Sequence, residues 1–163
     1  MDVNVNLQNE ATTQHQPNLR QRILVADDDP AIRRLNSEAL LRSGYQVDAV
    51  ENGADAWEAV QLKNYDLMVT DYKMPKMTGV ELIKKLHAAN LALPVIMATG
   101  TMPTWEFSLY PWIRPTAMLL KPYTFEELLE TVKNVLHANA DARREIAPPP
   151  DWQGQPLPNG LRL

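Results

Sequence analysis

Short apolar runs alternate along the chain with longer stretches in which apolar residues recur every three or four positions. Continuous runs of this length are typical of strands buried on both faces of a parallel sheet. The stretches between them have the spacing of amphipathic helices. The runs are Ile23–Ala26, Leu67–Thr70, Pro94–Ala98 and 116–120, and Tyr45–Val50 alternates like a strand. Alternating strands and helices predict right-handed crossovers, and hence a doubly wound α/β fold with helices on both faces of a five-stranded parallel sheet.

Most of the predicted helices begin with a capping signal. An Asp or Asn before a helix can accept hydrogen bonds from its first backbone N–H groups, and a Thr followed three residues later by Glu can form a reciprocal capping box. These signals are Asp29 before Pro30, Asn52 before Gly53, and the pairs Thr78 with Glu81 and Thr124 with Glu127. They indicate where four helices begin.

The segment between the fourth and fifth strands breaks this regularity. Its prolines are Pro103, Pro111 and Pro115. They leave at most about two helical turns between Thr104 and Tyr110, since a proline inside a helix costs roughly 3 kcal/mol. We therefore expect a short or irregular fourth helix.

Four aromatic residues lie in the same segment: Trp105, Phe107, Tyr110 and Trp112. They are interpreted either as core packing or as an exposed recognition or dimer patch, because aromatic residues are favoured at interface cores. Solvent exposure separates the two interpretations. Burial of both Trp105 and Trp112 within one protomer would exclude the patch.

The two ends of the sequence lack these patterns. Residues 1–20 are rich in amides, so we expect a disordered or loosely ordered leader before a domain that spans 21–138. Periodicity is lost beyond residue 138, and the Pro-rich tail over 139–163 is too short for a helix-turn-helix output domain. Trp152 lies among the prolines of this tail, where it belongs either to an unstructured segment or to a short docking motif.

Composition narrows the class of protein. The 163 residues carry a formal net charge of −4, and acidic and basic residues are interspersed. This argues against direct DNA binding and against association with a membrane surface. Cysteine is absent, which excludes disulfides and thiol chemistry. No signal-peptide pattern and no apolar run of about 18 residues is present. We therefore expect a soluble cytoplasmic protein.

Polar side chains follow four of the predicted strands. They are Asp27 and Asp28 after the first strand, Asp71 after the third, Thr99 after the fourth and Lys121 after the fifth. The carboxyl ends of parallel strands share one edge of a sheet, where ligands bind. Carboxylates are hard ligands suited to Mg²⁺, and one of them can act as a nucleophile toward phosphorus. A hydroxyl and an ammonium could then contact the phosphoryl oxygens.

Each of these signals has a plain structural interpretation when taken alone. Asp71 could cap the turn that follows it, Thr99 could cap another turn, and Lys121 before a proline could be solvated. Their occurrence together, in this order and at successive strand ends, favours a functional site.

The motifs that carry these residues resemble those of a known family, the receiver domain of two-component response regulators. The resemblance extends from Arg22 to about Ala138 and implies a flavodoxin-like fold with strand order 2-1-3-4-5. It rests on the motifs Ile23–Asp29, Val69–Gly79, Met97–Gly100 and Leu120–Pro122.

The resemblance also implies roles for individual residues. Asp71 would be the phosphoacceptor and a Mg²⁺ ligand, Asp28 a direct ligand and Asp27 a ligand mainly through water. The backbone carbonyl of Lys73 would complete the protein ligands. Asp29 is instead expected to cap the first helix.

Thr99 and Lys121 would contact the phosphoryl group, by the same resemblance. The chain departs from the family at Met118, where an aromatic residue usually reports phosphorylation together with Thr99. Met118 has neither a hydroxyl nor a ring with two discrete orientations, so the familiar aromatic switch is in doubt.

The resemblance implies a stand-alone receiver that takes its phosphoryl group from a sensor histidine kinase or a phosphotransfer protein. It would signal by docking to a downstream protein or by passing the group on, and would catalyse only its own phosphorylation and dephosphorylation. Residues 102–120 and the last helix lie where this family dimerises and binds partners, which makes them a candidate homodimer surface.

Two other interpretations stay open. The first is a haloacid-dehalogenase-type phosphatase, because Asp27 and Asp29 mimic the Asp-x-Asp motif of that family. That family also needs an acidic metal-binding motif beyond the Lys, and the interpretation leaves the Asp71 strand unexplained.

The second is a pseudo-receiver that binds partners without phosphorylation. Met118 and the interrupted fourth helix keep this interpretation open.

Overall fold

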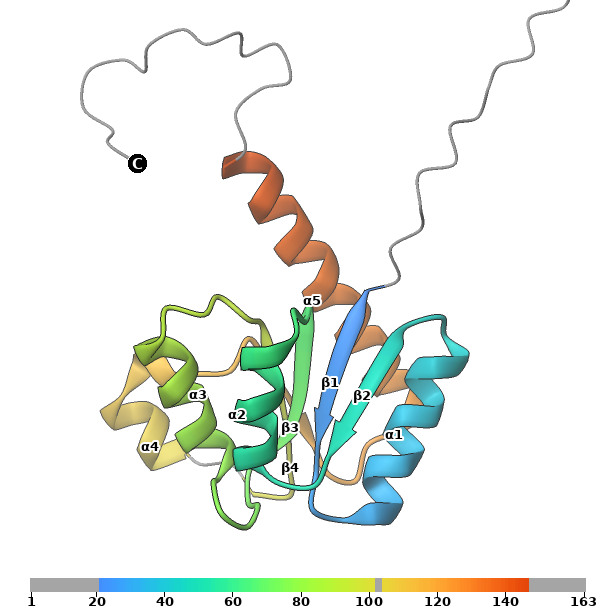
Figure 1. The fold of residues 1–163 in the computed structure, drawn as a ribbon, viewed down its shortest axis with the longest axis horizontal. Helices are drawn as coiled ribbons and strands as arrows, with labels where there is room; N and C mark the ends of the chain where they lie inside the picture. Colours follow the sequence, from blue (N-terminus) through green and yellow to red (C-terminus); the bar gives the residue numbers. More distant parts are fainter. Residues whose placement is uncertain (1–20, 102–103, 147–163) are drawn as a thin grey trace, which may run out of the picture.

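Five parallel strands alternate with helices in the computed structural model, which describes residues 21–101 and 104–146 (Figure 1). The strand order is β2-β1-β3-β4-β5, which confirms the predicted flavodoxin-like topology. The strands are β1 (Arg22–Ala26), β2 (Gln46–Val50), β3 (Leu67–Asp71), β4 (Val95–Thr99) and β5 (Ala117–Leu120). The helices are α1 (Pro30–Arg42), α2 (Gly53–Leu62), α3 (Gly79–Ala88), α4 (Thr104–Leu109), the 3₁₀ helix η1 (Pro111–Ile113) and α5 (Phe125–Ile146).

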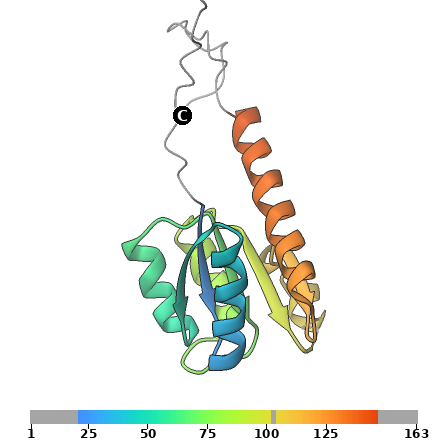
Figure 2. The ribbon, with the colours of Figure 1, turned by 90° about the vertical axis from the view of Figure 1, so that its right-hand side faces the viewer.

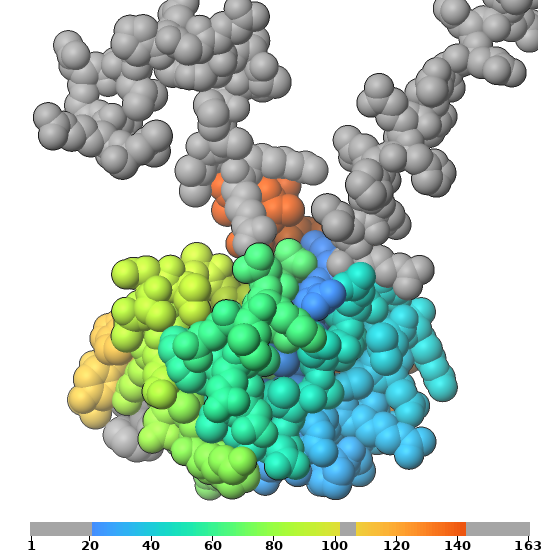
Figure 3. All heavy atoms as spheres, in the orientation of Figure 1, coloured from blue at the N-terminus to red at the C-terminus, as the bar shows by residue number. Residues whose placement is uncertain are grey.

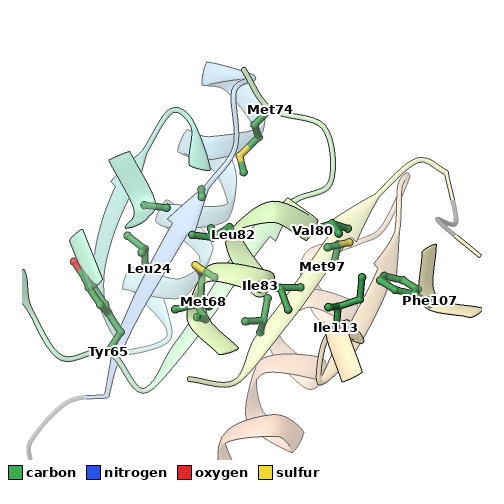
Figure 4. Close-up of a cluster of buried hydrophobic side chains, with 14 residues drawn as sticks. Leu24, Tyr65, Met68, Met74, Val80, Leu82, Ile83, Met97, Phe107 and Ile113 are labelled. Atoms are coloured by element: carbon green, nitrogen blue, oxygen red, sulfur yellow. The ribbon is translucent and has the colours of Figure 1, made fainter. Parts of the chain in front are cut away.

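Helices cover both faces of the sheet, so the central strands are apolar on both sides. On one face, Val69 of β3 shares a buried cluster with Leu40 of α1 and Leu128 of α5. On the other, Met68 of β3 shares a cluster with Ile83 of α3 and other side chains of α2, α4 and η1 (Figure 4). In Figure 3 the side chains of α2 and α3 cover the face turned to the viewer. Burial on both faces explains why the strands are continuous apolar runs.

The predicted caps are formed. The Asp29 carboxylate accepts hydrogen bonds from the backbone N–H groups of Ala31 and Ile32, at 2.8 and 3.2 Å. The capping boxes Thr78 with Glu81 and Thr124 with Glu127, and the Asn52 cap of α2, are also present. The local sequence therefore sets the start of these helices.

The segment between β4 and β5 is irregular, as predicted. Helix α4 has only 6 residues and is followed by η1. Phe107 and Ile113 are buried in the core, whereas Tyr110 and Trp112 are 42% and 54% exposed. The side chain of Trp105 is outside the described part of the structure. Because Trp112 is exposed, the condition that would have excluded an exposed patch is not met.

Helix α5 is longer than the sequence predicted. It runs to Ile146, eight residues beyond the expected end at residue 138, and extends clear of the sheet (Figure 2). The added turns lack an apolar stripe, but they are rich in Ala and Arg, which propagate a helix once its packed part has formed. The predictions for the leader 1–20 and for 147–163 fall outside the described residues.

Among the helices of the described ranges, none combines the length and the apolar character that crossing a bilayer demands.

Candidate phosphoacceptor site

The carboxyl edge of the sheet brings together three of the predicted side chains. Lys121, which follows β5, places its Nζ 3.0 Å from Oδ2 of Asp27 and 2.7 Å from Oδ1 of Asp71. Asp27 follows β1 and Asp71 ends β3, so these groups come from strands that are far apart in sequence. One ammonium therefore bridges two carboxylates at the position that the strand ends predicted.

Asp27 is held in a fixed orientation inside this edge. Its side chain is almost fully buried, and its Oδ1 accepts a hydrogen bond from the Asp29 N–H at 2.9 Å. Burial raises the pKa of the Asp27 carboxyl above its usual value, although the hydrogen bond from Lys121 opposes this rise. A buried carboxylate of this kind requires a nearby cation.

Lys121 supplies that cation. Burial by itself would lower the pKa of Lys121, but the hydrogen bonds to Asp71 and Asp27 outweigh burial and raise the pKa above its usual value. The side chain is thus an ammonium at neutral pH, close to both carboxylates.

Asp71 is fixed at both of its carboxylate oxygens. Lys121 donates to Oδ1, and the backbone N–H of Lys73 donates to Oδ2 at 2.9 Å. The side chain of Lys73 is exposed. The proposed ligand role of the Lys73 carbonyl stays a prediction.

Gly79 allows the first turn of α3 to approach the end of β3. Its N–H donates to the Tyr72 carbonyl at 2.9 Å, and a Cβ at this position would collide with the Asp71 carbonyl oxygen. The sequence motif contained Gly79, but the reason for a glycine became visible only from the fold.

Arg33 is a residue near the site that the sequence analysis missed. Its Nη1 donates to the Asp27 carbonyl at 2.7 Å and lies 3.5 Å from the Asp28 carbonyl. Asp28 itself is exposed. Arg33 is four residues after the Asp29 cap, one helical turn into α1, and this spacing is the signal that could have identified it. It ties the loop that carries both acidic side chains to the helix.

Thr99 and Met118, the predicted switch positions, lie on neighbouring strands. Thr99 is buried, and its hydroxyl donates to the Thr101 carbonyl at 2.8 Å, so it is turned toward its own loop. Met118 is partly buried against the cluster under α2 and α3, and it pairs with Met97 in the sheet. Thr99 is thus at the predicted edge, but its hydroxyl is engaged by the loop.

The acidic residues at this edge are candidate ligands of a metal ion. In the described part of the chain, no three His, Cys, Asp or Glu side chains form a ready-made metal site. Mg²⁺ does not require one, since it is usually held by one or two carboxylates and keeps several waters. Asp27 and Asp71, both within hydrogen-bond distance of one cation, provide carboxylates that fit this requirement.

Comparisons with known proteins agree with the fold. The family model described as the response regulator receiver domain matches residues 23–133. The response regulator receiver protein CpdR of Brucella abortus is 32% identical over 117 residues, which are 72% of this chain and 98% of CpdR. The chemotaxis protein CheY1 of Helicobacter pylori is 33% identical over 122 residues, covering 72% of this chain and 98% of CheY1. Two other curated relatives are much longer, and this chain spans 16% and 10% of their lengths.

Solved structures give the same result. The response regulator protein TrrA of Thermotoga maritima, in complex with Mg(2+)-BeF, superimposes with a TM-score of 0.63 and is 34% identical. The match covers 71% of this chain and 98% of TrrA. With a family model that spans most of the domain, and relatives matched over nearly their whole length, this chain belongs to the response regulator receiver domain family of two-component signalling.

Proposed function

We propose that this receiver domain accepts a phosphoryl group on Asp71 from a phosphohistidine of a sensor histidine kinase or a phosphotransfer protein. The observation that carries the proposal is the bridge from Lys121 to Asp27 and Asp71 at the carboxyl edge of the sheet. It supplies a held nucleophile, a second carboxylate and a cation within reach of one another. Catalysis is then limited to the domain's own phosphorylation and dephosphorylation.

The transfer follows from the groups present. An Asp71 carboxylate oxygen attacks phosphorus, the bond between phosphorus and the donor imidazole nitrogen breaks, and the imidazole leaves with its electron pair and takes up a proton. The Lys73 N–H keeps Oδ2 of Asp71 oriented while this bond forms. Lys121 offsets negative charge on the phosphoryl oxygens.

Asp27, Asp28 and Asp71, with the Lys73 carbonyl, would hold Mg²⁺ at this edge. When bound, the ion neutralises charge on the attacking and phosphoryl oxygens. The burial of the Asp27 carboxylate supports this assignment, because a charged carboxylate inside the protein needs a cation close to it.

The response to phosphorylation would start at Thr99. Its hydroxyl would leave the Thr101 carbonyl and donate to a phosphoryl oxygen, which moves the loop after β4. Met118 lies on the adjacent strand in contact with the core, where a flexible thioether can refill the space that such a movement opens. A downstream protein would then recognise the changed surface.

A homodimer through α4, β5 and α5 is part of the same proposal. Leu109 and Leu120 are 65% and 52% exposed in this region. Sedimentation before and after beryllofluoride treatment tests the idea. An unchanged monomer would remove the dimer and leave docking of another protein as the output.

Phosphorylation is tested by incubating the protein with Mg²⁺ and acetyl phosphate and measuring the intact mass. We expect the addition of one phosphoryl group, which is lost with Asp71→Asn and when Mg²⁺ is chelated. Asp66→Asn is a matched control. Asp66 precedes the opposite end of the same strand, where it accepts the Arg22 N–H at 2.9 Å, so phosphorylation should persist. If the wild-type protein is not modified and does not respond to beryllofluoride, the pseudo-receiver is the correct interpretation.

A further inference from the structure

An apolar groove lies at the opposite edge of the sheet from Asp71. It has a volume of about 440 Å³ and is bounded by the end of α3, the loop before β4, the segment after η1 and the middle of α5. Pro94 and Thr116, which precede β4 and β5, form part of its wall. The site of phosphorylation makes no use of this groove.

Most of the exposed side chains of the groove are apolar, and the exposed polar ones are His87, Arg114 and Thr116. Leu91 is 40% exposed, and Trp112 is 54% exposed even though its ring meets the edge of the His87 ring. Arg114 is also in the lining, and none of the described lining residues is Asp or Glu. In a chain of net charge −4, the groove is therefore suited to an apolar segment with a negative charge.

Helix α5 leads from this groove to a segment whose aromatic and acidic residues complement the aromatic and cationic residues of the groove. Ala138 and Asn139 line the groove, and the helix continues to Ile146 beyond the body of the domain (Figures 1 and 2). The residues that follow include Pro148, Pro149, Pro150, Asp151 and Trp152. Pro-rich segments bind aromatic-lined grooves, since they lose little conformational entropy on binding.

The length of this segment suits a return to the groove. The seven steps from Asn139 to Ile146 rise about 10 Å along the helix. The six steps from Ile146 to Trp152 reach about 19 Å in polyproline II conformation. The reach of the segment exceeds the rise of the helix, so Trp152 can fold back as far as Asn139, and the remaining length is available to span the distance to Trp112.

We propose that residues 148–152 of the chain dock intramolecularly into this groove, with Trp152 against Trp112 and Asp151 beside Arg114. The two partners have matching spacings. Asp151 and Trp152 are adjacent in the segment, and Trp112 and Arg114 are two residues apart in the groove. Docking covers the exposed aromatic surface of η1 and leaves the Asp71 edge open. A protein that binds the η1 surface must then displace this segment.

The proposal is tested on the full chain labelled with 5-fluorotryptophan, whose 4 signals are assigned by single Trp→Phe substitutions. We expect Trp152→Ala to move the Trp112 signal by more than its linewidth. Arg114→Glu should move the Trp152 signal to the position of a free fluorotryptophan, and adding Asp151→Arg should restore it. Lys133→Glu makes the same charge change at an exposed position of α5 outside the groove and should leave both signals in place.

Two results would overturn the proposal. The first is a Trp152 signal in the wild-type chain at the position of free fluorotryptophan, with Trp112 insensitive to Trp152→Ala. The second is a change in both signals on tenfold dilution, which would assign the groove to the segment of a second copy. An unchanged Trp57 signal checks that each variant is folded.

Discussion

The two halves of the sheet differ in how their loops are held. In the half built on β1 and β3, the acidic side chains accept backbone N–H bonds from the loops that follow them, and α3 is joined to β3 through Gly79. In the half built on β4 and β5, Thr99 makes a similar contact with Thr101, but the connection that follows is only a six-residue helix and a 3₁₀ turn. We call these the anchored half and the irregular half.

This difference matches two separate requirements of a receiver. Phosphoryl transfer needs carboxylates at fixed positions, because small displacements of reacting groups slow a reaction strongly. Reporting the transfer needs a region that can change its surface. The anchored half holds Asp27 and Asp71, and the irregular half holds Thr99, Met118 and the exposed aromatic residues.

The largest expected effect concerns the way in which the irregular half is attached to the core. Phe107 of α4 is 7% exposed and belongs to the cluster under α3, so Phe107→Ala should lower the free energy of unfolding by about 3 kcal/mol. Tyr110→Ala, at a largely exposed position, should cost about 0.5 kcal/mol. Urea unfolding measures both. Equal costs would mean that Phe107 does not anchor α4.

The next prediction tests the close approach in the anchored half. Gly79→Ala should lower the free energy of unfolding by about 2 kcal/mol, because the new Cβ meets the Asp71 carbonyl and forces α3 away. It should also slow phosphorylation of Asp71. Gly100→Ala is the matched control beside the same site, since its Cβ would meet open space. A Gly79→Ala protein as stable as the Gly100→Ala protein would contradict the assigned contact.

A smaller effect is expected from the tether of Arg33. Arg33→Ala should weaken Mg²⁺ binding by about 1 kcal/mol, because the carbonyls of Asp27 and Asp28 lose a hydrogen-bond donor. Removing a positive charge would by itself strengthen Mg²⁺ binding. Weaker binding would therefore show that Arg33 positions the loop that carries Asp27 and Asp28. Arg34→Ala is the control, since Arg34 is exposed and pairs with Glu38. Calorimetry measures the affinities, and tighter binding to Arg33→Ala would reject the tether.

The smallest effect concerns Asp48 on the edge strand β2, which pairs with β1 of the anchored half. Burial acts to raise its pKa, but hydrogen bonds from Tyr65 and Lys63 prevail and lower the pKa below the usual 3.8. A lowered carboxyl pKa stabilises the folded state above the unfolded pKa, and this stabilisation is lost as the pH falls. Asp48→Asn should therefore cost up to about 1 kcal/mol near pH 7. The difference from wild type should shrink as the pH falls below about 4 and vanish below the lowered pKa, and a difference independent of pH would rule out the ionic contribution.

Much of this fold could be predicted because its signals are local. The cap at Asp29 and the boxes at Thr78 and Thr124 act within a few residues of sequence, and the structure forms them all. The strand ends could be placed at one edge because parallel topology requires it. That Asp27, Asp71 and Lys121 share one edge follows from this topology, whereas the direct bridge from Lys121 to both carboxylates became visible only in the structure.

The features that escaped prediction depend on distances that only the fold sets. The spacing of Arg33 from the Asp29 cap indicates that it lies near the loop, but its partners are backbone carbonyls, which every residue possesses, so the sequence does not identify the contact itself. The orientation of the Thr99 hydroxyl depends on the loop that follows it. The end of α5 was placed too early because its last turns have helical propensity without an apolar stripe.

The ammonium between Asp27 and Asp71 has a consequence for the protein when divalent cations are scarce. Two carboxylates at this edge would repel each other, and one of them is buried. With Lys121 as a built-in counter-ion, the folded domain does not depend on a metal to neutralise its own acidic residues. Under the proposed function, Mg²⁺ would therefore be needed for phosphoryl transfer rather than for the fold of this edge.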